Sequence, residues 1–125
     1  MDVIRRLASQ TWVHVTFGAV LMGSWSFYAN RHHEVSETVR AAVLQAALSG
    51  FLTACLKMIA DRLLRFLPHW SLAAGTSLLF SATLLLAAHR VSGTPELAAT
   101  VSVPLLVSGS YIFAYCYIRR RPSLG

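Results

Sequence analysis

A stripe of polar residues runs along the apolar segment 41–60 at a strict four-residue spacing, formed by Gln45, Ser49, Thr53 and Lys57. A helix turns about 40° beyond a full turn for every four residues, so these side chains fan over only about 120° of one helix face. Glu37 precedes this polar stripe and Asp61 follows it. The segment is about one bilayer thickness long, so the stripe must be covered by protein, water or a ligand. The spacing therefore predicts a bundle of helices gathered around this one.

The polar stripe has two interpretations. Gln45, Ser49 and Thr53 can line a polar pathway that joins the two ends of the molecule. They can equally form hydrogen bonds between packed helices, with Gly50 allowing close approach, as small and hydroxyl residues do in membrane bundles. The spacing alone does not decide between the two.

A second group of polar residues is expected near the other end of the same segment. His14 and Lys57 differ in predicted depth by only about one helical turn, and Asp61 and Gln10 lie close by along their helices. Such a cluster could relay protons or bind a charged substrate. The alternative is that Lys57 reaches the interface and pairs with Asp61 at i,i+4, while His14 bonds a backbone carbonyl.

A third group lies where two connections are predicted to meet at one membrane surface, and it comprises Arg31, His32, His33, Glu37, Arg40, His89 and Arg90. The guanidinium groups suit a phosphate headgroup, because they donate two parallel hydrogen bonds to oxyanions. The histidines with a glutamate could ligate a divalent metal, although no spacing typical of a metal site occurs, and we predict neither metal nor cofactor. The remaining interpretation is a polar loop whose charges pair with one another and with lipid headgroups.

The composition of the chain identifies the elements that must position these groups. Of its 125 residues 55% are hydrophobic and only 13% are charged, and the mean hydropathy is +0.55. These values predict an integral membrane protein. The net charge of +6 does not indicate a nucleic-acid partner, because the basic residues cluster at the ends of apolar runs. Cys55 and Cys116 both lie inside apolar runs and predict no disulfide.

The hydropathy pattern predicts an all-α bundle of four transmembrane helices in one domain, 1–125, with spans at about 7–29, 37–62, 71–89 and 96–118. Ser36 and Thr94 are predicted to be the N-caps of the second and fourth helices. Gly18 and Gly23 are positions at which another helix can approach closely. Pro104 is predicted to kink the fourth helix.

The basic residues predict the orientation of this bundle. Three of the 11 basic residues, Arg31, Arg40 and Arg90, fall on the side opposite both termini. The remaining eight fall on the side of the termini: Arg5, Arg6, Lys57, Arg62, Arg65, Arg119, Arg120 and Arg121. By the positive-inside rule we expect both termini to be cytoplasmic, in a membrane of the bacterial inner-membrane type.

The leading functional hypothesis is transport. No nucleophile elbow, P-loop or dinucleotide fingerprint occurs, so we predict that the chain is not an enzyme. We expect a transporter or flippase-like carrier of an anionic or lipid-linked small molecule, in contact with membrane lipids and assembled as a homo-oligomer, most simply a dimer. In this hypothesis the three arginines Arg31, Arg40 and Arg90 capture the headgroup, the polar stripe guides it, and Lys57 with His14 receives it.

The alternative hypothesis is a non-catalytic accessory or assembly subunit of a larger membrane complex. The small-residue faces of the first and third spans would then dock a larger partner, and the polar stripe would serve packing. An ion channel is a third possibility, for which the sequence contains no selectivity-filter motif.

Overall fold

The computed structural model describes residues 2–120, apart from the side chains of residues 4, 7–9 and 11. Over this range the chain forms four helices, α1 (Asp2–Ala29), α2 (Val35–Phe66), α3 (Trp70–Ser92) and α4 (Leu97–Arg119). The connections are short, spanning residues 30–34, 67–69 and 93–96. Short connections between long helices place successive helices antiparallel and side by side.

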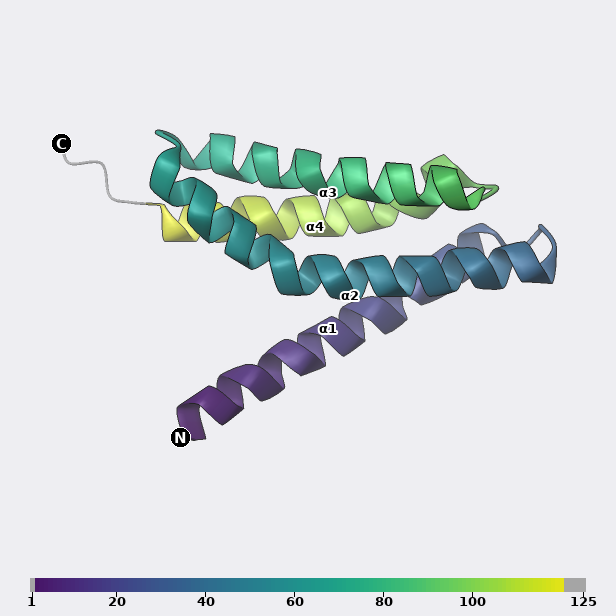
Figure 1. Cartoon of the computed structure of the whole chain (residues 1–125), viewed down its shortest axis with the longest axis horizontal. Coiled ribbons are helices and arrows are strands. Elements are labelled where there is room, and N and C mark those ends of the chain that lie inside the picture. Colours follow the sequence, from purple (N-terminus) through teal and green to yellow (C-terminus); the bar gives the residue numbers. More distant parts are fainter. Residues whose placement is uncertain (1, 121–125) are drawn as a thin grey trace.

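The helices associate as two helical hairpins, α1 with α2 and α3 with α4, and α2 also packs against α3 (Figure 1). We call the end that holds the connections 30–34 and 93–96 the hairpin end. The opposite end, with the start of α1, the connection 67–69 and the end of α4, is the terminal end. Figure 1 shows that α1 lies against α2 near the hairpin end and diverges from the other helices toward the terminal end.

Among the described residues, three helices are long and apolar enough to cross a membrane, namely α2, α3 and α4. The all-helical fold with apolar spans is therefore as the sequence predicts. The helices extend beyond the predicted spans, because α1 begins at Asp2, α2 continues to Phe66 and α3 continues to Ser92.

The two predicted N-caps are wrong. Glu34, rather than Ser36, precedes α2, and Glu96, rather than Thr94, precedes α4; neither makes a side-chain capping bond. The first helical turn of α2 already includes Ser36. Thr94 is excluded from a capping role because its hydroxyl oxygen lies 2.7 Å from Nδ1 of His89, across the α3–α4 turn.

Close packing of α1 on α2 depends on small residues, as predicted. A Cβ atom added to Gly23 would lie 3.0 Å from Cβ of Ala46 and 3.2 Å from the carbonyl oxygen of Ala42. Further along the same pair of helices, a Cβ on Gly50 would lie 3.4 Å from Val15. The two backbones therefore approach as closely as glycine allows, in the manner of small-residue helix pairs in membranes.

Small residues also fill the interface between α3 and the helices beside it. Ala73 and Ala74 of α3 are fully buried and pack in one cluster with Leu56, Ile112 and Cys116. Cys116 is thus a small buried hydrophobic residue within this cluster. These contacts join α2, α3 and α4 at the terminal end into a packed unit, and among the side chains that the structure describes none from α1 belongs to it.

Candidate functional site

A buried hydrogen-bond chain links α3 to α2 near the hairpin end. Nε2 of His89 lies 2.8 Å from Oε1 of Gln45, and the amide nitrogen of Gln45 donates to the Ser49 hydroxyl at 2.8 Å. An amide oxygen only accepts, so the His89 Nε2–H is the donor, and the neutral ring then accepts from Thr94 at Nδ1. His89 and Gln45 are both 0% exposed. Their polar groups are therefore used to hold α2 and α3 together.

Asn30 forms a second buried junction at the same end. Its side-chain nitrogen donates to the Thr100 hydroxyl at 2.8 Å, and its side-chain oxygen accepts from the Glu96 backbone N–H at 3.0 Å. Its backbone carbonyl accepts from the Thr38 hydroxyl at 2.6 Å. Asn30 is 0% exposed and contacts residues of α2, of α4 and of the turn before α4. This one residue ties the end of α1 to α2, to α4 and to the turn before α4.

The other residues predicted at this end remain near the surface. Nε2 of His33 donates to the Glu96 carboxylate at 2.9 Å. The Arg31 guanidinium lies 3.8 Å from the centre of the Tyr28 ring and donates to the Tyr28 carbonyl at 2.7 Å. Of the remaining predicted residues, Glu37 is partly buried and three are exposed, namely His32, Arg40 and Arg90. Within residues 2–120, no three His, Cys, Asp or Glu side chains come together as a metal site would require.

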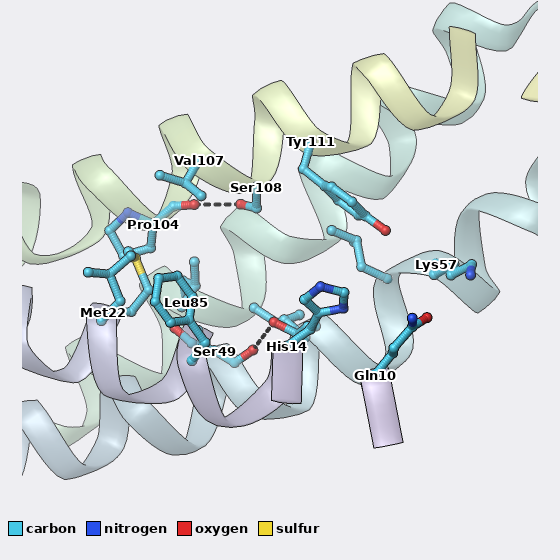
Figure 2. Close-up of a pocket in the computed structure, with 16 residues that line it drawn as sticks. Gln10, His14, Met22, Ser49, Lys57, Leu85, Pro104, Val107, Ser108 and Tyr111 are labelled. Carbon is cyan, nitrogen blue, oxygen red and sulfur yellow. Dashed lines mark hydrogen bonds between the residues drawn. The ribbon is translucent and has the colours of Figure 1, made fainter. Parts of the chain in front are cut away.

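A cavity of about 670 Å³ opens between the helices toward the terminal end, where α1 diverges (Figure 2). The lining residues of α1 run from Gln10 to Met22, and those of α2 run from Ser49 to Lys57. Leu85 of α3 and the segment of α4 from Pro104 to Tyr111 complete the wall. All four helices thus contribute to a single compartment.

The lining of this cavity changes in character along its length. Gln10, His14, Lys57 and Tyr111 stand at one side, and Met22, Leu85 and Pro104 lie at the opposite side (Figure 2). The intervening wall is apolar and is formed mainly by Phe17, Leu21, Leu52, Leu56 and Val107. A polar mouth above an apolar compartment is the arrangement that suits an amphiphilic ligand.

The few polar groups in the apolar part already have hydrogen-bond partners. The Thr53 hydroxyl donates to the Ser49 carbonyl at 2.7 Å, and the Ser108 hydroxyl donates to the Pro104 carbonyl at 2.6 Å. The Ser49 hydroxyl accepts from Gln45. These bonds lie within α2 and α4, so the deep part of the cavity presents mainly carbon to a ligand.

The Asp61 carboxylate is bonded by a residue of another helix. This carboxylate accepts from the Tyr115 hydroxyl at 2.7 Å, and Nε of Arg119 lies 3.3 Å from the same hydroxyl. In the described part of the chain Lys57 forms no ion pair with Asp61; its Nζ atom lies 5.8 Å from the centre of the Tyr115 ring. The predicted i,i+4 pair is therefore wrong, because the tyrosine of α4 takes the carboxylate.

The structure brings together some of the residues that the sequence groups and separates others. His14, Lys57 and Gln10 do share one cavity, as the depth argument predicted, whereas Asp61 is not among its lining residues. The polar stripe is divided, since Gln45 belongs to the buried hydrogen-bond chain while Thr53 and Lys57 face the cavity. Ser49 belongs to both.

Sequence reasoning missed three important residues, Asn30, Tyr111 and Tyr115. Asn30 carried a usable signal, since an uncharged amide directly after an apolar helix often bonds backbone groups there. The two tyrosines lie toward the end of the fourth predicted span, where their spacing indicates no partner. Their roles depend on which helix lies beside α4, which the local sequence does not report.

Comparison of the chain with known protein families, curated proteins and solved structures finds no match. Function is therefore inferred from geometry. The two features that bear on it are a buried polar network at the hairpin end and an amphipathic cavity that opens toward the terminal end.

Proposed function

We propose that this chain is a membrane carrier that takes an anionic, lipid-like small molecule into the cavity from the terminal end. The observation that carries the proposal is the gradient of the lining, in which a lysine and hydrogen-bonding side chains stand above an apolar compartment. An amphiphile can place its headgroup at Lys57 and His14 and its hydrocarbon between the helices. The chain supplies binding and passage and has no proposed catalytic residue.

The membrane arrangement forms part of this proposal. At about 1.5 Å per residue, the 28 residues of α1 reach across a bilayer, and α1 packs on the apolar helix α2, so we assign it as a fourth span. The excess of basic residues at the terminal end supports cytoplasmic termini in a bacterial-type inner membrane. The cavity lies where α1 diverges from the other helices, and we expect a second copy of the chain in a homodimer to pack beside it there.

Transport in this arrangement requires the hairpin end to open. The bonds of Asn30 and the chain His89–Gln45–Ser49 close the path beyond the cavity. Opening there would release the headgroup near Arg31, Arg40 and Arg90, which lie at that end and carry the charge to receive it. The cavity and the network are then the open and the closed end of one carrier.

The test measures the passage of a defined amphiphile from the inner to the outer leaflet of vesicles that contain the purified protein. Radiolabelled tetradecyl phosphate is loaded in both leaflets, and albumin extracts only what reaches the outer leaflet. We expect the protein to accelerate extraction, Lys57→Gln to abolish the acceleration and Lys57→Arg to restore it. Arg62→Gln, which removes an exposed cation of α2 outside the cavity lining, is the matched control. Equal extraction with and without protein would contradict the proposal.

A second candidate, an accessory subunit, is favoured by one observation. The diverging part of α1 exposes large apolar side chains, with Trp12 at 71% and Phe17 at 66% exposure. A helix of a partner protein could lie in the opening beside them. This candidate predicts no acceleration by the chain alone, and it predicts one defined partner that is lost when Phe17 is replaced by Ser.

A further inference from the structure

We infer that the cargo is an amphiphile with one hydrocarbon chain of roughly ten to fifteen carbons and one anionic oxygen headgroup, bound with that headgroup at Lys57. This inference rests on the proposed function and names the class of molecule that the cavity takes. Three features of the lining carry it: its depth, its volume and the sign of its charge.

The depth of the cavity matches half a bilayer. From Lys57 to Ser49 along α2 the wall is about 12 Å deep, and from Gln10 to Met22 along α1 it is about 18 Å deep, at 1.5 Å per residue. Half of the hydrocarbon core of a membrane is about 15 Å. An extended chain advances about 1.2 Å per bond, so this depth accommodates roughly ten to fifteen bonds. The cavity thus fits a chain that ends near the bilayer midplane.

The volume of the cavity is that of a site for one small molecule. A value of about 670 Å³ lies within the range of about 300–1,000 Å³ that is usual for pockets holding one drug-sized ligand. A single chain of fourteen carbons with a phosphate has roughly 19 non-hydrogen atoms, which is the size of such a ligand, whereas a lipid with two such chains has about twice as many. The volume therefore favours a ligand with one chain.

The polar mouth selects a negative headgroup. Lys57 is the cation among the described lining residues, and Gln10, His14 and Tyr111 add hydrogen-bonding groups beside it. No Asp or Glu is among those residues, and the nearby carboxylate of Asp61 is bonded to Tyr115 at 2.7 Å. Lys57 would repel a cationic headgroup, whereas a carboxylate or phosphate would gain charge-assisted bonds from it.

The test is native mass spectrometry of the full chain released from a mild detergent, with four probes compared at equal concentration. The probes are tetradecyl phosphate, tetradecanoate, tetradecyltrimethylammonium and dimyristoyl phosphatidic acid. We expect one bound molecule per chain for the two single-chain anions, with binding about tenfold or more weaker for the cation and for the two-chain lipid. The phosphate and carboxylate arms show which of the two anionic headgroups is preferred.

Two variants on neighbouring positions of α4 locate the bound probe. Val107 lines the cavity, whereas Leu106 is 70% exposed and lies outside the lining. Val107→Trp should fill the apolar compartment and abolish binding of tetradecyl phosphate, and Leu106→Trp should leave binding unchanged. Lys57→Gln should weaken binding of both single-chain anions by about tenfold, as loss of a charge-assisted contact does.

The possible failures of this test are distinguishable. If the two-chain anion binds as tightly as the single-chain anions and remains sensitive to Val107→Trp, the chain assignment is overturned while the carrier proposal stands. If the cation binds as tightly as the anions, the charge assignment is overturned. If no probe binds, or if Val107→Trp and Leu106→Trp act alike, both the inference and the proposed function are contradicted.

Discussion

The two ends of the molecule use similar polar residues for opposite purposes. At the hairpin end Asn30, Gln45 and His89 are fully buried, and each forms a hydrogen bond with a residue of another helix. At the terminal end Gln10, His14 and Lys57 face a cavity. Polar groups that find partners on neighbouring helices hold the fold together, whereas those left facing an opening are available to a ligand.

The difference follows from how the chain connects its helices. At the hairpin end the connections 30–34 and 93–96 force four helix ends together, so polar side chains there are within reach of one another. At the terminal end α1 diverges from the packed unit of α2, α3 and α4. The hairpin end is thus closely tied together, whereas the terminal end is open beside α1.

The largest effect on stability is expected from Asn30→Leu. The change removes both side-chain bonds to other segments and leaves the partly buried Glu96 N–H and the buried Thr100 hydroxyl without their partner. The free energy of unfolding should fall by about 3 kcal/mol, measured by SDS titration in mixed micelles with tryptophan fluorescence. Ser110→Ala, which removes only a bond within α4, is the control. A decrease no larger than that of the control would contradict the role of the hairpin end.

A smaller effect is expected for the bond between α3 and α2. His89→Ala and Gln45→Leu should each lower the free energy of unfolding by about 2 kcal/mol. The double variant should lose about 1 kcal/mol less than the sum, because the two side chains share one hydrogen bond. If the loss in the double variant equals the sum of the losses in the two single variants, the hydrogen bond between His89 and Gln45 contributes nothing to the free energy of unfolding.

Two glycines test how closely α1 packs on α2, because Gly23 lies in that contact and Gly75 does not. Gly23→Ala should lower the free energy of unfolding by about 1–2 kcal/mol, since the new Cβ would press on Ala46 and on the Ala42 carbonyl. Gly75→Ala is the matched variant, because nothing lies within 4 Å of the added atom. It should be neutral or raise stability by up to about 1 kcal/mol, as alanine favours helix. Similar losses in both would refute the close contact between α1 and α2.

The smallest effect on stability is expected at the terminal end. Lys57→Gln changes an exposed side chain without an ion pair among the described residues, so the free energy of unfolding should move by less than about 0.5 kcal/mol. The same variant should weaken binding of tetradecyl phosphate by about tenfold. A large decrease in the free energy of unfolding together with weaker binding would show that Lys57 stabilises the fold and does not bind the ligand directly.

Much of the architecture was accessible from local sequence, while the site depended on packing. Hydropathy alone delimits the four apolar segments, and the four-residue spacing alone puts Gln45, Ser49, Thr53 and Lys57 on one face. Gly23 was recognisable as a contact because only small residues allow backbones so close. These predictions need no knowledge of which helices are neighbours.

The contacts between helices could not be predicted in this way. The sequence predicts His89 at the surface beside Arg90, but α3 continues to Ser92 and His89 is buried against Gln45. The spacing along α2 suggests a pair of Asp61 with Lys57, whereas the Asp61 carboxylate accepts a hydrogen bond from Tyr115 of α4. The divergence of α1, which forms the cavity, leaves no mark in its own apolar pattern, because it depends on the rigid-body placement of the whole helix.

The most direct test of the account is to map where a photoactivatable single-chain anion binds to the protein in vesicles. A tetradecyl phosphate with a diazirine at its chain end is irradiated, and the labelled positions are read by peptide mass spectrometry. The account predicts labels on the apolar wall, at Leu21, Leu52 and Val107, and a marked decrease of this labelling in Lys57→Gln at the same probe concentration. Labels confined to exposed positions away from the cavity, such as Leu79 and Leu106, would contradict it.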